Sequence, residues 1–160
     1  MEIKTELKYP YSEEKRLDFI VEQNHKNGYE IREVQTQFNI PDLQAWGYTE
    51  EEIEQQQAER IARLHLTRGD VFRALLLAKQ VTRAQIRALI EAMPSETPEQ
   101  MLAKEMALID FDEALEFYRG VALIDTLGEQ LNITPEQMTR FFETNDYQEL
   151  IRQPEEEENE

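Results

Sequence analysis

The chain has 160 residues, of which 34 are acidic and 17 are basic, so its formal net charge is −17 at pH 7. It has no cysteine, which excludes disulfides, thiolate nucleophiles and cysteine-ligated zinc or iron–sulfur sites. No apolar run approaches the roughly 18 residues that span a bilayer, the first residues contain no signal-peptide core, and the net charge repels phosphate. We therefore expect a cytoplasmic protein that binds neither membranes nor nucleic acid.

The first 37 residues predict a strand, a helix and a second strand. Residues 1–9 alternate charged and apolar side chains, which is the pattern of a half-buried strand. Ser12 is suited to cap the helix that follows, and Gly28 is suited to end it in the left-handed conformation. Residues 29–37 alternate again. Two strands alone are marginally stable in water, so we expect them to need a helix cover, a third strand or a partner chain. The pattern leaves open whether they pair with each other.

Helix start signals dominate the rest of the chain. Five threonines stand three residues before an acidic or amide side chain, which is the spacing of a capping box: Thr49, Thr67, Thr82, Thr97 and Thr134. We predict a bundle of about six to seven short helices over residues 41–152. The expected fold class is mainly α with a small N-terminal α+β part. Its expected divisions are a strand–helix–strand part (1–37), a linker (38–48), a helical domain (49–152) and a disordered acidic tail (153–160).

The stretch from residue 98 to residue 119 carries apolar side chains on two sides of a helix. One face comprises Ala107, Leu108, Phe111, Ala114, Leu115 and Tyr118. The opposite face comprises Leu102, Met106 and Ile109. Because the apolar side changes near Ile109, and Asp110 stands at capping-box spacing from Glu113, we predict a kink or a break in the helix there.

Residues for catalysis or cofactor binding are not evident. The two histidines, His25 and His65, are predicted at a helix end and just before a cap, and only two serines, Ser12 and Ser95, are present. The chain contains no phosphate-binding glycine motif and no HExxH zinc motif. We therefore predict no catalytic, cofactor-binding or metal-binding residue, and no enzymatic activity.

Basic side chains are concentrated in one segment. Residues 60–90 carry a net charge of +6, against −23 for the remaining residues. Its basic residues are Arg60, Arg63, Arg68, Arg73, Lys79, Arg83 and Arg87.

Three interpretations of this segment stay open. The basic residues neutralise acidic segments of the same chain, form a docking face for an acidic protein partner, or belong to a helix-turn-helix that reads DNA. The overall negative charge argues against the last of these. Trp46 and Tyr48 are candidate aromatic anchors, because aromatic side chains dominate the energetics of protein interfaces.

Several stretches in combination resemble small acidic uncharacterised proteins predicted in bacterial prophages, near late genes for tail and baseplate parts. The resemblance rests on the sequences of residues 9–33 and 111–144, and on AWGYTEEE (45–52) and LTRGDVF (66–72). It implies a phage-derived origin, without an assigned catalytic activity, and a location in the bacterial host cytoplasm or on the virion. Residues 34–44 are additional to the resemblance, and their role is open.

The sequence thus favours a non-enzymatic interaction protein. The resemblance further implies a virion-associated or tail-assembly component that acts through surface complementarity. The alternative is a small acidic phage inhibitor or regulator that occupies a basic, nucleic-acid-binding site of a host protein. The expected partner is a phage structural protein or a host protein. Self-association through the N-terminal strands is a further expectation.

Overall fold

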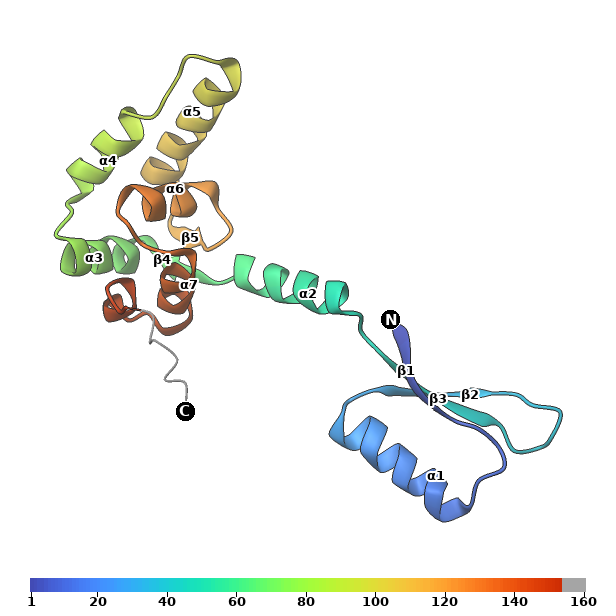
Figure 1. Cartoon of the computed structure of the whole chain (residues 1–160). Helices are drawn as coiled ribbons and strands as arrows, with labels where there is room; N and C mark the ends of the chain where they lie inside the picture. Colours follow the sequence, from blue (N-terminus) through green and yellow to red (C-terminus); the bar gives the residue numbers. More distant parts are fainter. Residues whose placement is uncertain (154–160) are drawn as a thin grey trace. The chain divides into compact units, whose positions relative to one another are not determined.

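The computed structural model describes residues 1–153 (Figure 1). The chain forms two compact units, an N-terminal unit (Met1–Gln57) and a C-terminal unit that begins at Ala58. The described residues are mostly helical, with a small antiparallel sheet in the N-terminal unit, so the predicted fold class is confirmed at this level. The acidic tail predicted for residues 153–160 lies outside the described residues except for Gln153.

The N-terminal unit is a three-stranded antiparallel sheet with one helical segment. Its strands are β1 (Glu2–Leu7), β2 (Glu30–Val34) and β3 (Asp42–Gly47), in the spatial order β1-β3-β2. The two predicted strands do not pair with each other, because each pairs with β3 instead, as in Leu7 opposite Leu43 and Ile31 opposite Ala45.

Residues 38–48 are therefore not a linker along their whole length. Within them, β3 buries Leu43, Ala45 and Gly47, which alternate with half-buried side chains. Two of the three residues on the buried side are small, so the strand lacks the bulky apolar alternation that would have identified it. In addition, Pro41 immediately before it suggests a loop.

The helix predicted between the first two strands is present. It consists of α1 (Glu13–Ile20), which continues as a π-helical segment, η1 (Val21–Lys26). The Ser12 hydroxyl accepts a hydrogen bond from the backbone N–H of Lys15, as expected of the cap. Gly28 follows with a φ of +71°, a conformation in which a side chain would be strained.

The C-terminal unit contains the remaining helices. Helix α2 (Glu50–Ala62) has residues in both units. It is followed by α3 (Arg68–Lys79), α4 (Arg83–Glu91), α5 (Pro98–Glu113), α6 (Ala122–Gln130), α7 (Pro135–Thr144) and a short 3-10 helix, η2 (Tyr147–Leu150). All five predicted threonine caps accept a hydrogen bond from the backbone N–H three residues on, as expected.

Two short strands of the C-terminal unit were not predicted. These are β4 (His65–Thr67) and β5 (Glu116–Tyr118), which pair in antiparallel orientation and place Leu66 opposite Phe117. Three-residue strands are too short to show a period in the sequence. Together with the helices they enclose a core whose largest fully buried side chains include Phe117, Phe141, Leu75, Ile86 and Leu123.

The break predicted near Ile109 is wrong. Helix α5 runs without interruption to Glu113 and buries Ala107 and Phe111. Its second apolar face lies in solvent, with Leu102, Met106 and Ile109 exposed. The helix therefore does not need to break to bury both faces, because it buries only one of them.

Candidate docking site

Part of the predicted basic segment surrounds a pocket of about 550 Å³ between α3 and the start of α4. Three apolar side chains, Phe72, Leu76 and Val81, line the pocket together with three arginines. The arginines are Arg68, Arg73 and Arg83. Among the described residues that line the pocket, none is acidic. The pocket thus combines an apolar lining with positive charge.

The local sequence explains how these side chains come together. Arg68, Phe72 and Leu76 follow one another at four-residue spacing, so they share one side of α3. Gln80 ends α3 with a φ of +56°, and the Thr82 capping box starts α4 two residues later. Figure 1 shows the short connection between α3 and α4. Because the connection is short, Val81 and Arg83 line the same pocket as this side of α3.

Aromatic rings contact two of the three arginines, Arg68 and Arg83. The guanidinium carbon of Arg68 lies 5.5 Å from the ring centre of Phe72 and 5.7 Å from that of Phe111. The guanidinium carbon of Arg83 lies 5.4 Å from the Phe72 ring centre. Such cation–π contacts orient a guanidinium without neutralising its charge.

The three arginines differ in whether a carboxylate of the same chain neutralises their charge. Arg73 pairs with Asp70 at 3.1 Å. Arg68 donates a hydrogen bond from Nη1 to the backbone carbonyl of Asp112 at 2.6 Å, which leaves its charge without a carboxylate partner. Arg83 has no ion pair within residues 1–153. The pocket therefore retains positive charge that an acidic ligand can meet.

The other four predicted basic residues do not line this pocket. Arg87 pairs with Glu91 at 3.0 Å and with Asp112. Its hydrogen bond to Asp112 raises the Arg87 pKa. Arg60 pairs with Glu143 at 3.4 Å. The described part of the chain provides no ion pair for Arg63 or Lys79.

Neutralisation within the chain thus accounts for part of the basic segment, and the docking face stays a prediction. Arg60, Arg73 and Arg87 are neutralised by carboxylates of the same chain. Arg68 and Arg83 carry the positive charge that remains at the pocket. The apolar half of the pocket was not predicted as part of a site, although the four-residue spacing of Arg68, Phe72 and Leu76 was available as a signal.

The candidate anchors Trp46 and Tyr48 lie in the N-terminal unit. Trp46 is half-buried on β3, where its ring packs against Arg32, whose guanidinium carbon lies 4.4 Å from the ring centre. Its indole Nε1 donates to Gln44 at 3.0 Å. Trp46 is therefore occupied by its own sheet, whereas Tyr48 is exposed beside a pocket of about 380 Å³.

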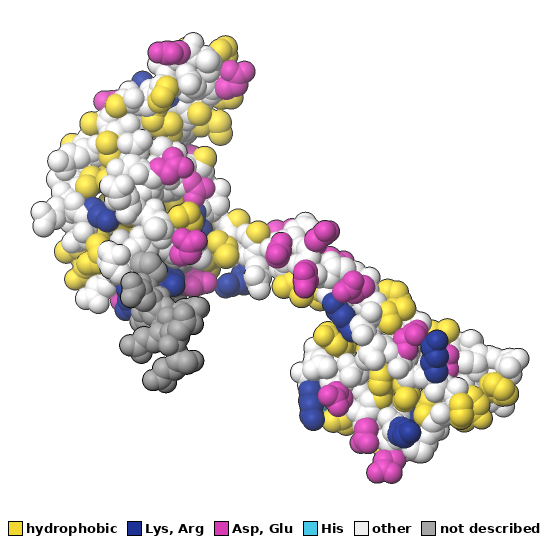
Figure 2. All heavy atoms as spheres, viewed as in Figure 1, with side chains coloured by type: hydrophobic (Ala, Val, Ile, Leu, Met, Phe, Trp, Pro, Cys, Tyr) yellow, Lys and Arg dark blue, Asp and Glu magenta, His cyan; other side chains and the backbone are white. Residues whose placement is uncertain are grey.

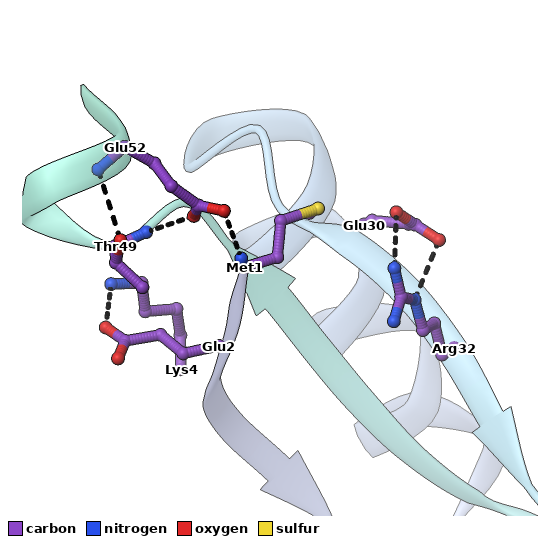
Figure 3. A network of polar contacts seen from close by, with 7 residues as sticks. All are labelled: Met1, Glu2, Lys4, Glu30, Arg32, Thr49 and Glu52. Carbon is purple, nitrogen blue, oxygen red and sulfur yellow. Dashed lines mark hydrogen bonds and ion pairs between the residues drawn. The ribbon is translucent and has the colours of Figure 1, made fainter. Parts of the chain in front are cut away.

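A polar network surrounds this sheet (Figure 3). Arg32 donates two hydrogen bonds to Glu30, at 2.9 and 3.2 Å, which lowers the pKa of Glu30. Glu52 accepts hydrogen bonds from the Met1 ammonium at 2.6 Å and from the backbone N–H of Thr49 at 2.8 Å, and both lower its pKa. The Met1–Glu52 contact ties the start of β1 to the first turn of α2, whereas the Glu30–Arg32 pair lies within β2.

The sheet order leaves β1 and β2 as edges, so self-association through them stays a prediction. The pairing register of β1 shifts between Ile3 and Thr5, at Lys4. A bulge and a lysine on an edge strand are features that oppose the addition of a further strand.

Residues 1–153 contain neither a metal-binding cluster nor a membrane-spanning helix. Within that range, no cluster of three or more histidine, aspartate or glutamate side chains could hold a metal ion. No helix in the same range is both long enough and apolar enough to cross a bilayer. His65 stacks on Tyr118 with ring centres 5.2 Å apart, and His25 lies in the last turn of η1.

The comparisons with known proteins found no match among family models, curated proteins or solved structures.

Proposed function

We propose that the protein is a non-enzymatic interaction protein that docks an acidic protein segment in the pocket between α3 and α4. The observation that carries this proposal is the combination of an apolar lining with Arg68 and Arg83, neither of which has a carboxylate partner among the described residues. A pocket of about 550 Å³ is within the range of clefts that bind drug-sized ligands, so several side chains of a partner can enter it.

The preferred ligand is a peptide segment with a large apolar side chain flanked by carboxylates. The overall charge of −17 does not prevent such binding, because charges farther away than about 8 Å are largely screened at physiological ionic strength. The local positive charge of the pocket then determines whether an acidic segment is attracted to it. The prophage resemblance supplies the proposed context, a virion-associated or tail-assembly component in a bacterial host.

The test is binding of a fluorescently labelled peptide in which leucine is flanked by glutamates on both sides. We expect Arg83→Glu to weaken binding by about tenfold or more, because a contact between opposite charges becomes one between like charges. Arg63→Glu is the matched control, since it changes the net charge equally at an exposed arginine that does not line the pocket. Equal loss in both variants would refute the proposal, since it would show that only the overall charge matters.

A second candidate function is the alternative from the sequence, an acidic inhibitor that occupies a basic site of a host protein. It is supported by Glu99, Glu105 and Glu113 of α5, which have no ion pair among residues 1–153. Its test is strongly salt-dependent binding to purified basic host nucleases or polymerases. For this function we expect Glu105→Gln to weaken binding and Arg83→Glu to have no such effect.

A further inference from the structure

Helix α5 presents an apolar stripe framed by negative charge. The stripe consists of Leu102, Met106 and Ile109, whose exposed fractions are 63%, 55% and 58%. At 100° per residue, Glu113 lies in line with the stripe at its C-terminal end. Glu99 lies to one side of its N-terminal end, and Glu105 and Asp110 flank it on either side.

The four carboxylates around the stripe, those of Glu99, Glu105, Asp110 and Glu113, form its acidic frame, and nothing within residues 1–153 neutralises them. None of its four carboxylates takes part in an ion pair with a described residue. Lys104, the only basic residue of α5, lies on the opposite side of the helix and is half-buried. Figure 2 shows hydrophobic side chains over α4 and α5, with acidic side chains close to them.

The α5 stripe and the arginine pocket have complementary chemistry. Each has three apolar side chains at its centre, but the stripe is framed by carboxylates and the pocket by guanidinium groups. We infer that the acidic segment bound by the pocket is the α5 stripe of a second copy of this chain. The inference rests on the proposed function, because it requires the same pocket to be a docking site.

Like charges disfavour the two symmetric alternatives. Packing two α5 stripes against each other would bring two frames of carboxylates together, and packing two pockets together would do the same with arginines. Only contact between the stripe of one copy and the pocket of the next pairs opposite charges. Made reciprocally, this contact closes a two-fold dimer; made head-to-tail, it leaves one stripe and one pocket free, so assembly continues into a ring or a filament.

The contact should be weak and sensitive to salt. Three apolar side chains make a smaller patch than the roughly 800 Å² per partner of a standard stable interface. Most of the charged groups that frame the two surfaces are exposed, so salt screens their attraction. We therefore expect an apparent mass that rises with protein concentration and falls when the salt concentration is raised from about 50 mM to about 500 mM.

The test is sedimentation of two full-length variants, each blocked at one surface. Arg83→Glu blocks the pocket and Met106→Asp blocks the stripe, and both residues are exposed, so the fold should be retained, as checked by circular dichroism. Each variant alone should be monomeric. An equimolar mixture should form a dimer and stop there, because only one intact stripe and one intact pocket can meet. Met101→Asp is the matched control, since Met101 is 55% exposed on α5 but lies outside the stripe.

Three results would overturn the inference. The first is a wild-type protein that stays monomeric at concentrations up to about 1 mM in low salt. The second is a mixture of the two blocked variants that stays monomeric. The third is loss of association in Met106→Asp while Arg83→Glu still associates, which would indicate a symmetric α5 contact. In each case the pocket can still bind the glutamate-flanked leucine peptide, so the proposed function is judged separately.

Discussion

The guanidinium carbon of Arg83, at the start of α4, lies 5.4 Å from the ring centre of Phe72 on α3. The same ring contacts Phe111 and Phe117, with centres 5.3 and 5.7 Å away. Phe72 is thus part of the core and also part of the pocket lining. Arg83 belongs to the pocket alone. We therefore expect Phe72 to contribute much more than Arg83 to the stability of the fold.

Substitutions at Phe72 and Arg83 should differ in their effect on the free energy of unfolding. We expect Phe72→Ala to lower the free energy of unfolding by about 3–5 kcal/mol, because it leaves a cavity in the core. Arg83→Gln should change that free energy by no more than about 0.5 kcal/mol, as an exposed side chain without an ion pair to a described residue. Urea denaturation monitored by circular dichroism measures both. A loss of more than about 2 kcal/mol in Arg83→Gln would show that the pocket is primarily structural.

Gly120 should not tolerate a side chain. A Cβ there would lie 2.9 Å from the Cβ of Ala62 and 3.2 Å from its backbone, which cannot move aside. We expect Gly120→Ala to lower the free energy of unfolding by about 1–3 kcal/mol through overpacking. Gly69→Ala is the comparison, because its Cβ would meet only the mobile end of Arg73. That variant should be as stable as the wild type or up to about 1 kcal/mol more stable, because alanine favours the helix.

Arg119 should contribute to stability through its hydrogen bonds. Its side chain is 9% exposed and donates to Asp125 at 2.6 Å, to Thr139 at 3.1 Å and to the carbonyl of Pro135 at 3.3 Å. We expect Arg119→Met to lower the free energy of unfolding by on the order of 2–3 kcal/mol.

Asp125→Asn provides the control for Arg119, because Asp125 is largely exposed and the other two hydrogen bonds remain. Asp125→Asn should lower the free energy of unfolding by less than half as much as Arg119→Met does. If the two variants lose equal stability, the ion pair with Asp125 rather than the full set of hydrogen bonds explains the effect of Arg119.

Stability of the N-terminal unit should depend on pH through Glu30. Its pKa is lowered by the hydrogen bonds from Arg32, so its contribution is complete above the ordinary glutamate pKa of about 4.3. That contribution is lost as the pH falls through the lowered pKa of the folded state. Glu30→Gln should therefore be less stable than the wild type at pH 7 and equally stable near pH 2.

Trp46 is the only tryptophan and packs against Arg32, so its fluorescence during urea denaturation reports this difference. A difference between wild type and Glu30→Gln that is unchanged at pH 2 would contradict the role assigned to the Glu30 carboxylate.

Local signals in the sequence were sufficient for most helices. Thr82, Thr97 and Thr134 predicted helix starts correctly, because a capping box depends on residues only three positions apart. Strand β3 was missed because its place depends on two partners distant in the chain. The continuous α5 was missed because a helix with two apolar faces cannot be distinguished, from its period alone, from two helices that meet at a kink.

The site was predicted in part. Charge counting found Arg68, Arg73 and Arg83, because basic residues concentrated in one segment are visible without a fold. It could not separate them from Arg60, whose partner Glu143 is distant in the sequence. Nor could it show that α5 would present a stripe with the reverse chemistry, since exposure is a property of the folded chain.

The position of β3 in its sheet has a consequence for the order of folding. As the chain emerges during synthesis, β1, α1 and β2 are complete by Val34, but neither strand has a neighbour until Asp42–Gly47 arrive. The sheet can therefore close only after its middle strand is made. A nascent chain stalled before residue 42 should remain sensitive to protease throughout β1, whereas one stalled after α2 has left the ribosome should be protected there.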